Sequence, residues 1–240
     1  MIAPALRIRG DLLLDGAFLS RGLEIDCPGG RWTCLLGASG VGKSTIGRII
    51  AGLPVAARLE GEVICPDDLH GRVTMMGQRD QLLPWASVLD NVTVGARLRG
   101  QRPDRARAGE LLERVGLAGL EHRRPAALSG GQRQRVALAR TMIEDRPVVV
   151  LDEPFSALDA ATRAAMQDLA ARLLVGRTVL LITHDPLEAA RLGHHACLMT
   201  AWGSVVVPLP DGDAPRPLDA PGVLAAQGAL FGALSRPCAA

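Results

Sequence analysis

Residues Trp32–Ser44 read Trp-Thr-Cys-Leu-Leu-Gly-Ala-Ser-Gly-Val-Gly-Lys-Ser, and this stretch decides the fold. Its apolar start, Trp32–Leu36, predicts a short strand, and a helix is expected from Lys43 to about Ala51. The loop between them fits the pattern G-x-x-x-x-G-K-[ST]. Its glycines let successive backbone N–H groups point inward at phosphate oxygens, and the start of the helix adds partial positive charge. The stretch therefore predicts a phosphate-binding loop in an α/β protein.

The two side chains that end this loop suit a nucleotide phosphate and its metal ion. Of the 27 basic residues in the chain, Lys43 is the only lysine. A compact ammonium group can reach the β- and γ-phosphates, where the flat and bulkier guanidinium of arginine would fit poorly. The Ser44 hydroxyl is a candidate ligand for Mg²⁺.

A pair of acids follows a second apolar run. Val148–Leu151 predicts a buried strand, and Asp152 and Glu153 come directly after it. In open α/β sheets, ligands bind at the carboxyl ends of the strands. We expect Asp152 to hold Mg²⁺ through its water shell and Glu153 to act as general base on the attacking water.

The segment Leu128–Arg135, Leu-Ser-Gly-Gly-Gln-Arg-Gln-Arg, resembles the signature motif of ABC ATPases. Ser129 and the backbone of Gly130 and Gly131 stand at the start of a predicted helix, Gln132–Thr141, and form a second candidate anion-binding turn. A protein with one nucleotide site per chain does not need two such turns. The second is best explained if it serves the ATP of another subunit, and the resemblance implies a head-to-tail homodimer with two ATP molecules at its interface.

Three further positions resemble family motifs in the family's order along the chain. Gln78 resembles the Q-loop glutamine, which senses Mg²⁺ or water, and Ser156–Asp159 resembles the D-loop. His184, after the predicted strand Thr178–Ile182, resembles the switch histidine that contacts the γ-phosphate.

The resemblance implies ATP and Mg²⁺ as cofactors of an ATPase. The implied catalytic residues are Glu153, His184 and Gln78, and the implied metal ligands are Ser44, Gln78 and Asp152. The residues implied to contact the nucleotide are Gly37, Ala38, Ser39, Gly40, Val41, Gly42, Lys43, Ser44, Thr45, Ser129, Gly130, Gly131, Gln132 and Asp159.

The adenine ring lacks an obvious stacking partner. The family usually places an aromatic residue, often tyrosine, upstream of the phosphate loop, but this chain has no tyrosine. Phe18 lies about 25 residues before Lys43 and is either the stacking residue or part of the core. An aliphatic side chain such as Leu14 is the other candidate.

The segment Gln81–Val92 contains Leu-Leu-Pro-Trp followed by Val-x-x-Asn-Val and looks like the nitrate, sulfonate and taurine group of importers. That group also includes carriers of the thiamine precursor hydroxymethylpyrimidine. Trp85 is either an exposed anchor for a membrane partner or a residue that packs the helical region. The resemblance implies integral-membrane permease subunits and a solute-binding protein as partners, and a peripheral location on the cytoplasmic face of the inner membrane. A DNA-repair or translation ABC ATPase is the alternative.

The order of strand-like and helix-like segments predicts a P-loop NTPase core of the ABC ATPase type. It has an N-terminal antiparallel β piece (6–26) and an inserted helical subdomain at about residues 87–145. We expect the ATPase domain to span residues 1–207, and residues 208–240 to form a proline-rich linker and short tail that contains a helix at Gly222–Leu234.

Bulk composition narrows the possible classes. A net charge of +2 gives no electrostatic footprint for nucleic acid, and no apolar run reaches the roughly 18 residues of a membrane span. The first residues lack the pattern of a signal peptide. The five cysteines form no C-x-x-C pair, so reduced and mostly buried thiols are expected at Cys27, Cys34, Cys65, Cys197 and Cys238.

Overall fold

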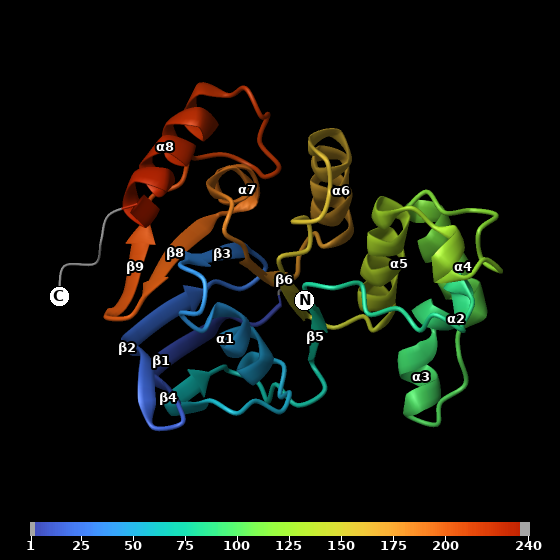
Figure 1. Cartoon of the computed structure of the whole chain (residues 1–240), viewed down its shortest axis with the longest axis horizontal. Helices are drawn as coiled ribbons and strands as arrows, with labels where there is room; N and C mark the ends of the chain where they lie inside the picture. The colour runs from blue at the N-terminus through green and yellow to red at the C-terminus, as the bar shows by residue number, and fades with distance from the viewer. Residues whose placement is uncertain (1–2, 236–240) are drawn as a thin grey trace. The chain divides into compact units, whose positions relative to one another are not determined.

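The computed structural model describes residues 3–235, which form two sheets and surrounding helices (Figure 1). The strands are β1 Leu6–Leu14, β2 Ala17–Cys27, β3 Trp32–Gly37, β4 Arg58–Ile64, β5 Val73–Met76, β6 Val148–Asp152, β7 Thr178–Ile182, β8 His195–Thr200 and β9 Gly203–Val207. The helices are α1 Lys43–Ile50, α2 Val88–Val92, α3 Val94–Leu98, α4 Arg105–Arg114, the 3₁₀ turn η1 Pro125–Ala127, α5 Gly130–Ile143, α6 Ala160–Leu173, α7 Pro186–Leu192 and α8 Pro221–Ser235.

Contacts divide the chain into two compact units. The first consists of the described parts of Met1–Met75, Pro147–Glu153 and Leu174–Ala240, and the second of Met76–Arg146 and Pro154–Leu173. Helices α2 to α5 lie within the predicted helical range 87–145, and the second unit also includes α6. The division of the chain at residue 207 stays a prediction.

The larger sheet has the strand order β5-β6-β7-β3-β8-β9. Strand β3 runs parallel to β7 on one side and to β8 on the other, and β6 runs parallel to β7. Every residue of β3, β6 and β7 is buried, as expected for the continuous apolar runs of a parallel sheet covered on both faces. Because these strands are parallel, the segments after them come together at one edge of the sheet.

The smaller sheet has the order β2-β1-β4 and is antiparallel. Its apolar side chains, including Ile8, Leu12 and Ile25, share one core with β3, β6, β7 and α1. The predicted α/β architecture with an N-terminal antiparallel β piece is therefore confirmed.

Some elements differ from the sequence prediction. The glycine-containing run Gly61–Cys65 predicts a strand, but strand β4 begins three residues earlier, at Arg58, because its pairing with β1 continues to Leu13 opposite Arg58. Helix α7 and strands β8 and β9 were not predicted. Helix α8, Pro221–Ser235, matches the predicted helix at the end of the chain.

The cysteines within the described range are free thiols, and Cys27, Cys34 and Cys197 are buried. Burial raises the pKa of Cys27 to about 12 and that of Cys197 to about 11, so both stay protonated and unreactive at neutral pH. Cys238 lies outside the described residues. Among residues 3–235, no helix has the length and hydropathy needed to cross a bilayer.

Candidate functional site

The phosphate loop, Gly37–Ser44, connects the buried strand β3 to α1 in the first unit. Two of its glycines are required by backbone conformation and by space. Gly37 has φ +148°, and a Cβ there would lie 2.3 Å from the carbonyl oxygen of Met199. Gly42 has φ +105°, and a Cβ there would lie 2.3 Å from Leu12. Backbone conformation and the surrounding atoms therefore favour glycine at both positions.

Lys43 is held in place by its own loop. Its Nζ donates to the carbonyl oxygens of Gly37 at 2.7 Å and Ala38 at 2.8 Å, and the residue is only 7% exposed. An ammonium group has three N–H donors, and these carbonyls take two of them. Burial lowers the pKa of Lys43, while the nearby carboxylates of Glu153 and Asp152 oppose that effect. The ammonium is thus fixed over the loop and close to both acids.

Ser44 and Asp152 form the second contact of the site. The Ser44 hydroxyl donates to Oδ1 of Asp152 at 2.9 Å, although the two residues are 108 positions apart. Asp152 ends β6 and is buried. Burial raises the pKa of Asp152, and the hydrogen bond from Ser44 opposes that rise. A buried carboxylate next to a hydroxyl is a donor set of hard oxygen atoms, which fits Mg²⁺.

Glu153 and His184 form the third contact. The Nδ1 atom of His184 lies 3.2 Å from Oε1 of Glu153; the Glu153 side chain is 19% exposed and that of His184 is 62% exposed. Glu153 has φ +48°, an unfavourable conformation for a residue with a side chain, and its N–H donates to Ile182 at the end of β7. Strain of this kind, of about 1–3 kcal/mol, is concentrated at functional sites. The turn after β6 is therefore bent away from the strand direction, and Glu153 does not continue the line of Asp152.

His184 is positioned by its neighbours in the chain. The Thr183 hydroxyl donates to Oε2 of Glu188 at 2.6 Å, and both residues are buried. The N–H of Asp185 donates to the Thr183 hydroxyl, and the Asp185 side chain caps the start of α7 by accepting from the N–H of Leu187. The turn Thr183–Asp185 is thus fixed to α7 on both sides of His184. Sequence reasoning did not find Thr183 and Glu188.

The signature turn, Ser129–Gln132, lies in the second unit. The Ser129 hydroxyl accepts from the N–H of Gln132 at 3.2 Å, and the Gln132 side chain accepts from the N–H of Ser129 at 2.9 Å. This reciprocal arrangement is a capping box that begins α5. The pattern Ser-x-x-Gln would have predicted the box from the sequence.

A cleft of about 480 Å³ opens beside the signature turn. Besides the signature turn, it is lined by residues that include Asp159, Thr162 and Arg135. Asp159 accepts from the N–H of Thr162 at 3.0 Å, and backbone hydrogen bonds, first that from Thr162, lower its pKa. Asp159 therefore stays ionised, as a cap for α6, next to the turn.

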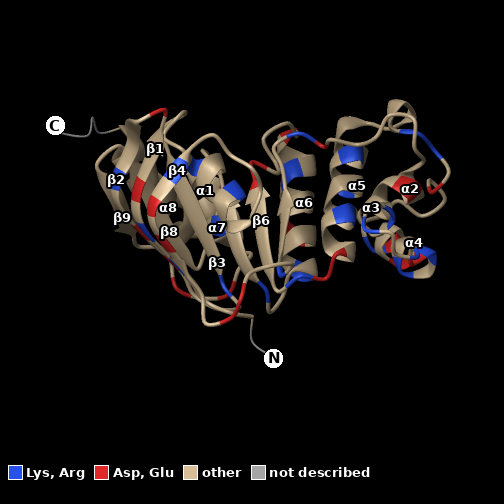
Figure 2. Ribbon diagram, turned by 90° about the horizontal axis from the view of Figure 1, so that it is seen from below, with Lys and Arg blue, Asp and Glu red and all other residues tan. Residues whose placement is uncertain are grey.

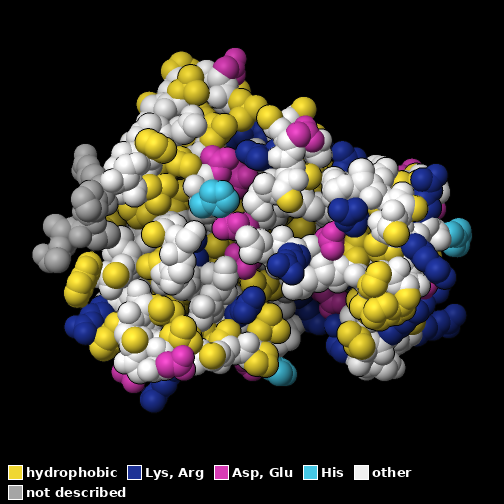
Figure 3. All heavy atoms as spheres, viewed as in Figure 1, with side chains coloured by type: hydrophobic (Ala, Val, Ile, Leu, Met, Phe, Trp, Pro, Cys, Tyr) yellow, Lys and Arg dark blue, Asp and Glu magenta, His cyan; other side chains and the backbone are white. Residues whose placement is uncertain are grey.

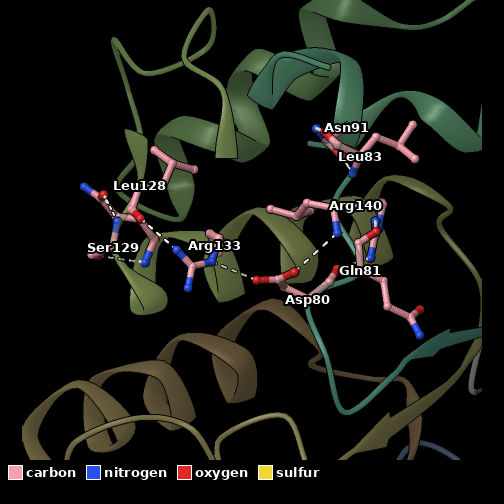
Figure 4. Close-up of polar contacts among 10 residues, drawn as sticks. Asp80, Gln81, Leu83, Asn91, Leu128, Ser129, Arg133 and Arg140 are labelled. Atoms are coloured by element: carbon pink, nitrogen blue, oxygen red, sulfur yellow. Dashed lines mark hydrogen bonds and ion pairs between the residues drawn. The ribbon is translucent and has the colours of Figure 1, made fainter. Parts of the chain in front are cut away.

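Gln78 comes two residues after β5 and lies in the second unit, but it does not line the cleft beside the signature turn. Two arginines of α5 hold the segment that follows it (Figure 4). Arg133 donates to the carboxylate of Asp80 at 2.9 Å and to the carbonyl oxygen of Leu128 at 2.9 Å. Arg140 donates to the carbonyl oxygens of Asp80 and Gln81. One helix thus ties the segment after Gln78 to the residue before Ser129. Figure 2 shows the basic residues of α5 in blue.

The Leu-Leu-Pro-Trp segment is fixed by Asn91. The buried Asn91 side chain accepts from the N–H of Leu83 at 2.7 Å and donates to three carbonyl oxygens, those of Leu83, Ala86 and Ser87. Trp85 sits within this turn and is 71% exposed. The alternative that Trp85 packs the helical region is therefore wrong.

Phe18 is 43% exposed and lies under the guanidinium of Arg21 at 3.9 Å, so it is not a core residue either.

The structure therefore places the expected residues in two clusters. In the first unit, Ser44 is hydrogen-bonded to Asp152, Glu153 contacts His184, and Lys43 interacts electrostatically with both acids. In the second unit, the signature turn and Asp159 share a cleft.

Comparison with known proteins gives a consistent picture. A model of the family described as ABC transporter matches residues 20–156. An uncharacterized ABC transporter ATP-binding protein of Haemophilus influenzae is 42% identical over 216 residues, which cover 86% of this chain and 88% of that protein. An aliphatic sulfonates import ATP-binding protein, SsuB, of Rhodopseudomonas palustris is 45% identical over 224 residues, which cover 90% of this chain and 77% of that protein. The solved structure of cbiO1 from Clostridium perfringens, part of the ABC transporter complex cbiONQ, matches with a TM-score of 0.73 and 25% identity, over 83% of this chain and 86% of that chain.

Proposed function

The chain belongs to the ABC transporter family of ATP-binding proteins, and from that premise we propose that it hydrolyses ATP to drive import of a small solute through membrane-spanning partner polypeptides. The observation that carries the proposal is the meeting of the Ser44–Asp152 and Glu153–His184 pairs beside the phosphate loop. An aliphatic sulfonate is the proposed kind of solute, because relatives that are 45% and 50% identical to this chain over the aligned residues are named for sulfonate import.

Nucleotide binding would use the loop and its two terminal side chains. The backbone N–H groups of Gly37–Thr45 and the Lys43 ammonium would hold the β- and γ-phosphates. Ser44 and Asp152 are the residues of this chain that would hold Mg²⁺, and Gln78 is proposed as a further ligand. The metal ion would supply neutralisation of charge on the phosphate oxygens.

Hydrolysis would depend on Glu153, the acid that follows β6. Glu153 accepts a proton from the attacking water as general base. The 3.2 Å distance between Nδ1 of His184 and Oε1 of Glu153 supports the proposal that the imidazole acts beside the base and contacts the γ-phosphate. The bent backbone at Glu153 supports this assignment, because it separates the base from the metal-binding carboxylate one residue before it.

The signature turn would act on the nucleotide of a second copy. Ser129, Gly130, Gly131 and Gln132 present a hydroxyl and N–H groups at the start of α5, but this turn contains no cation of its own. In the head-to-tail homodimer proposed for the ATP-bound state, each nucleotide lies between the phosphate loop of one copy and the signature turn and Asp159 of the other.

The adenine ring would stack near the start of β2. Phe18 is exposed and has the Arg21 guanidinium over one face of its ring, so an adenine would stack on the opposite face or displace the guanidinium. Leu14 is the aliphatic alternative.

The partners proposed for this chain are permease subunits in the inner membrane and a solute-binding protein, with the chain bound peripherally on the cytoplasmic face. The exposed Trp85 is the proposed anchor for the permease, because Asn91 fixes the turn that presents it. The sulfonate import relatives do not favour a DNA-repair or translation role.

The test is ATP hydrolysis by the purified chain and by Glu153→Gln, with Glu24→Gln as the control for an exposed glutamate on β2. We expect Glu153→Gln to lose about 10²- to 10⁴-fold in turnover while still binding ATP and accumulating a dimer. If Glu153→Gln hydrolyses ATP like the parent, the catalytic assignment is wrong. If neither protein turns over, the measurement is repeated on the complex with the permease.

A further inference from the structure

The segment from Pro208 to Ser235 has no role in the site described above, yet it is firmly attached to α7. Helix α8 buries Val223, Ala226 and Leu230, and it packs against α7 (Figure 1). The surface over α8 is formed by hydrophobic and uncharged atoms (Figure 3), and the helix contains no charged residue. Its attachment to α7 therefore depends on packing and on the chain that precedes it.

The strongest attachment is made by Arg216, which is 7% exposed. Its guanidinium donates to the carbonyl oxygens of Ala190 at 3.0 Å and Gly193 at 2.8 Å, at the end of α7. It also donates to Pro210 at 2.6 Å and Gly212 at 3.2 Å, within its own segment. A single side chain thus joins the end of α7 to the loop that leads to α8.

The backbone and the side chain of Arg191 complete this attachment. The N–H of Arg216 donates to the carbonyl oxygen of Arg191 at 2.9 Å, and Nε of Arg191 donates to the carbonyl oxygen of Arg216 at 3.1 Å. The last carbonyl groups of a helix have no partner inside the helix. Here Arg216 supplies partners for two of them, those of Ala190 and Arg191, so the C-terminal segment satisfies groups that α7 cannot satisfy itself.

No space is left for a side chain at Gly193, the residue that follows α7. A Cβ on Gly193 would lie 2.6 Å from Leu209 of the segment, 2.7 Å from the carbonyl oxygen of Ala189 and 2.9 Å from the thiol of Cys34 on β3. The end of α7 is therefore enclosed between the sheet and the C-terminal segment.

The other end of α7 holds the turn that carries His184. Glu188 accepts from Thr183, and Asp185 caps the helix, so His184 lies between two residues bonded to α7. Helix α7 spans only Pro186–Leu192, which is less than two full turns. A displacement of the C-terminal end of α7 would therefore also displace the turn Thr183–Asp185.

We propose that Arg216 is a positioning residue for hydrolysis, and that the C-terminal segment fixes α7 so that His184 faces Glu153. This inference rests on the role proposed above for His184. In this proposal, the segment after Pro208 fixes the position of His184, which lies more than twenty positions earlier in the chain.

The test compares Arg216→Met with Arg58→Met, which removes an exposed arginine of β4 in the same unit. We expect Arg216→Met to lower kcat about tenfold or more and to leave the KM for ATP within about twofold, because only the position of a reacting group changes. Amide hydrogen exchange should quicken at residues 183–193 and stay unchanged in the phosphate loop. Arg216→Lys, which keeps the charge with fewer donors, should lie between the parent and Arg216→Met, and it takes the place of Arg216→Met if that variant does not fold.

A double-mutant cycle with His184→Ala separates this inference from the function it rests on. If Arg216 acts through His184, Arg216→Met should change kcat less than about twofold in the His184→Ala background. Effects that multiply, or an unchanged kcat in Arg216→Met, would overturn the positioning role while leaving the ATPase assignment intact. Parent-like turnover in His184→Ala would overturn the role of His184 itself, and the positioning role with it.

Discussion

The phosphate loop and the signature turn both present backbone N–H groups at the start of a helix, but they are built in different ways. The phosphate loop has a lysine fixed by two carbonyl oxygens and lies against the buried strand β3. The signature turn is closed by a serine and a glutamine, and Ser129 and Gly130 are exposed. The first turn has the charge needed to bind a nucleotide within one chain. The second turn has no cationic residue within Ser129–Gln132, and the Arg135 side chain that lines its cleft comes from further along α5.

Among the substitutions that test this difference between the two turns, that of Lys43 should have the largest effect. We expect Lys43→Met to weaken ATP binding by the isolated chain about tenfold to hundredfold, since hydrogen bonds to charged groups contribute about 1.5–3 kcal/mol. The measurement is isothermal titration calorimetry with Mg-ATP.

Lys43→Arg is the matched control for charge. It should bind ATP nearly as poorly as Lys43→Met, because the enclosed position accepts a compact ammonium and not a planar fork. Parent-like affinity in Lys43→Arg would contradict the account of why the only lysine stands here.

Substitution of the signature serine should separate the two turns. In the isolated chain, Ser129→Arg should bind ATP with the affinity of the parent, whereas in the Glu153→Gln background it should weaken ATP-dependent dimerisation more than about tenfold. Analytical ultracentrifugation with and without ATP measures the second effect. Ser87→Arg, at the N-cap of α2 in the same unit, is the control and should leave dimerisation unchanged. A loss of ATP affinity in Ser129→Arg alone would mean that the signature turn serves its own chain.

The smallest effect is expected from Asp152→Asn, on the free energy of unfolding. The pKa of Asp152 is raised in the folded chain, so its ionised form opposes folding at every pH above the pKa of the unfolded chain, and this destabilisation disappears as the pH falls. Asp152→Asn should therefore raise the free energy of unfolding of the nucleotide-free protein at pH 7, although it removes a proposed metal ligand. Urea denaturation measures the change, and the gain should vanish at acidic pH. A lower stability at pH 7 would contradict the sign.

Much of the first cluster could be predicted from the sequence because its parts are local. The glycine pattern of Gly37–Ser44 predicts the loop, and Asp152 follows a run of β-branched residues that favours a buried strand. What the sequence could not predict is the bent backbone of Glu153 and the contact of Glu153 with His184, since both depend on the neighbouring strand β7.

The supporting residues could not be predicted, because they join distant parts of the chain. Arg133 and Asp80 are 53 positions apart, and Arg216 lies 23 positions from the carbonyl of Gly193 that it binds. An arginine on a helix is most often a solvated side chain, so neither residue stands out in a sequence read alone. Strands β8 and β9 were missed because their apolar runs, Ala196–Met199 and Val205–Val207, are only three to four residues long, and runs that short do not distinguish a strand from part of a buried helix.

The central claim, that each signature turn serves the nucleotide of the other copy, is tested most directly by mixing two defective chains. Both carry Glu153→Gln to prevent turnover; one also carries Lys43→Met and the other Ser129→Arg. In a head-to-tail dimer of the two, one site keeps an intact phosphate loop and an intact signature turn, and the second site has both defects. Native mass spectrometry should detect an ATP-dependent dimer that holds one ATP in the mixture and no such dimer for either chain alone. A mixture that behaves like the two separate chains would contradict the claim.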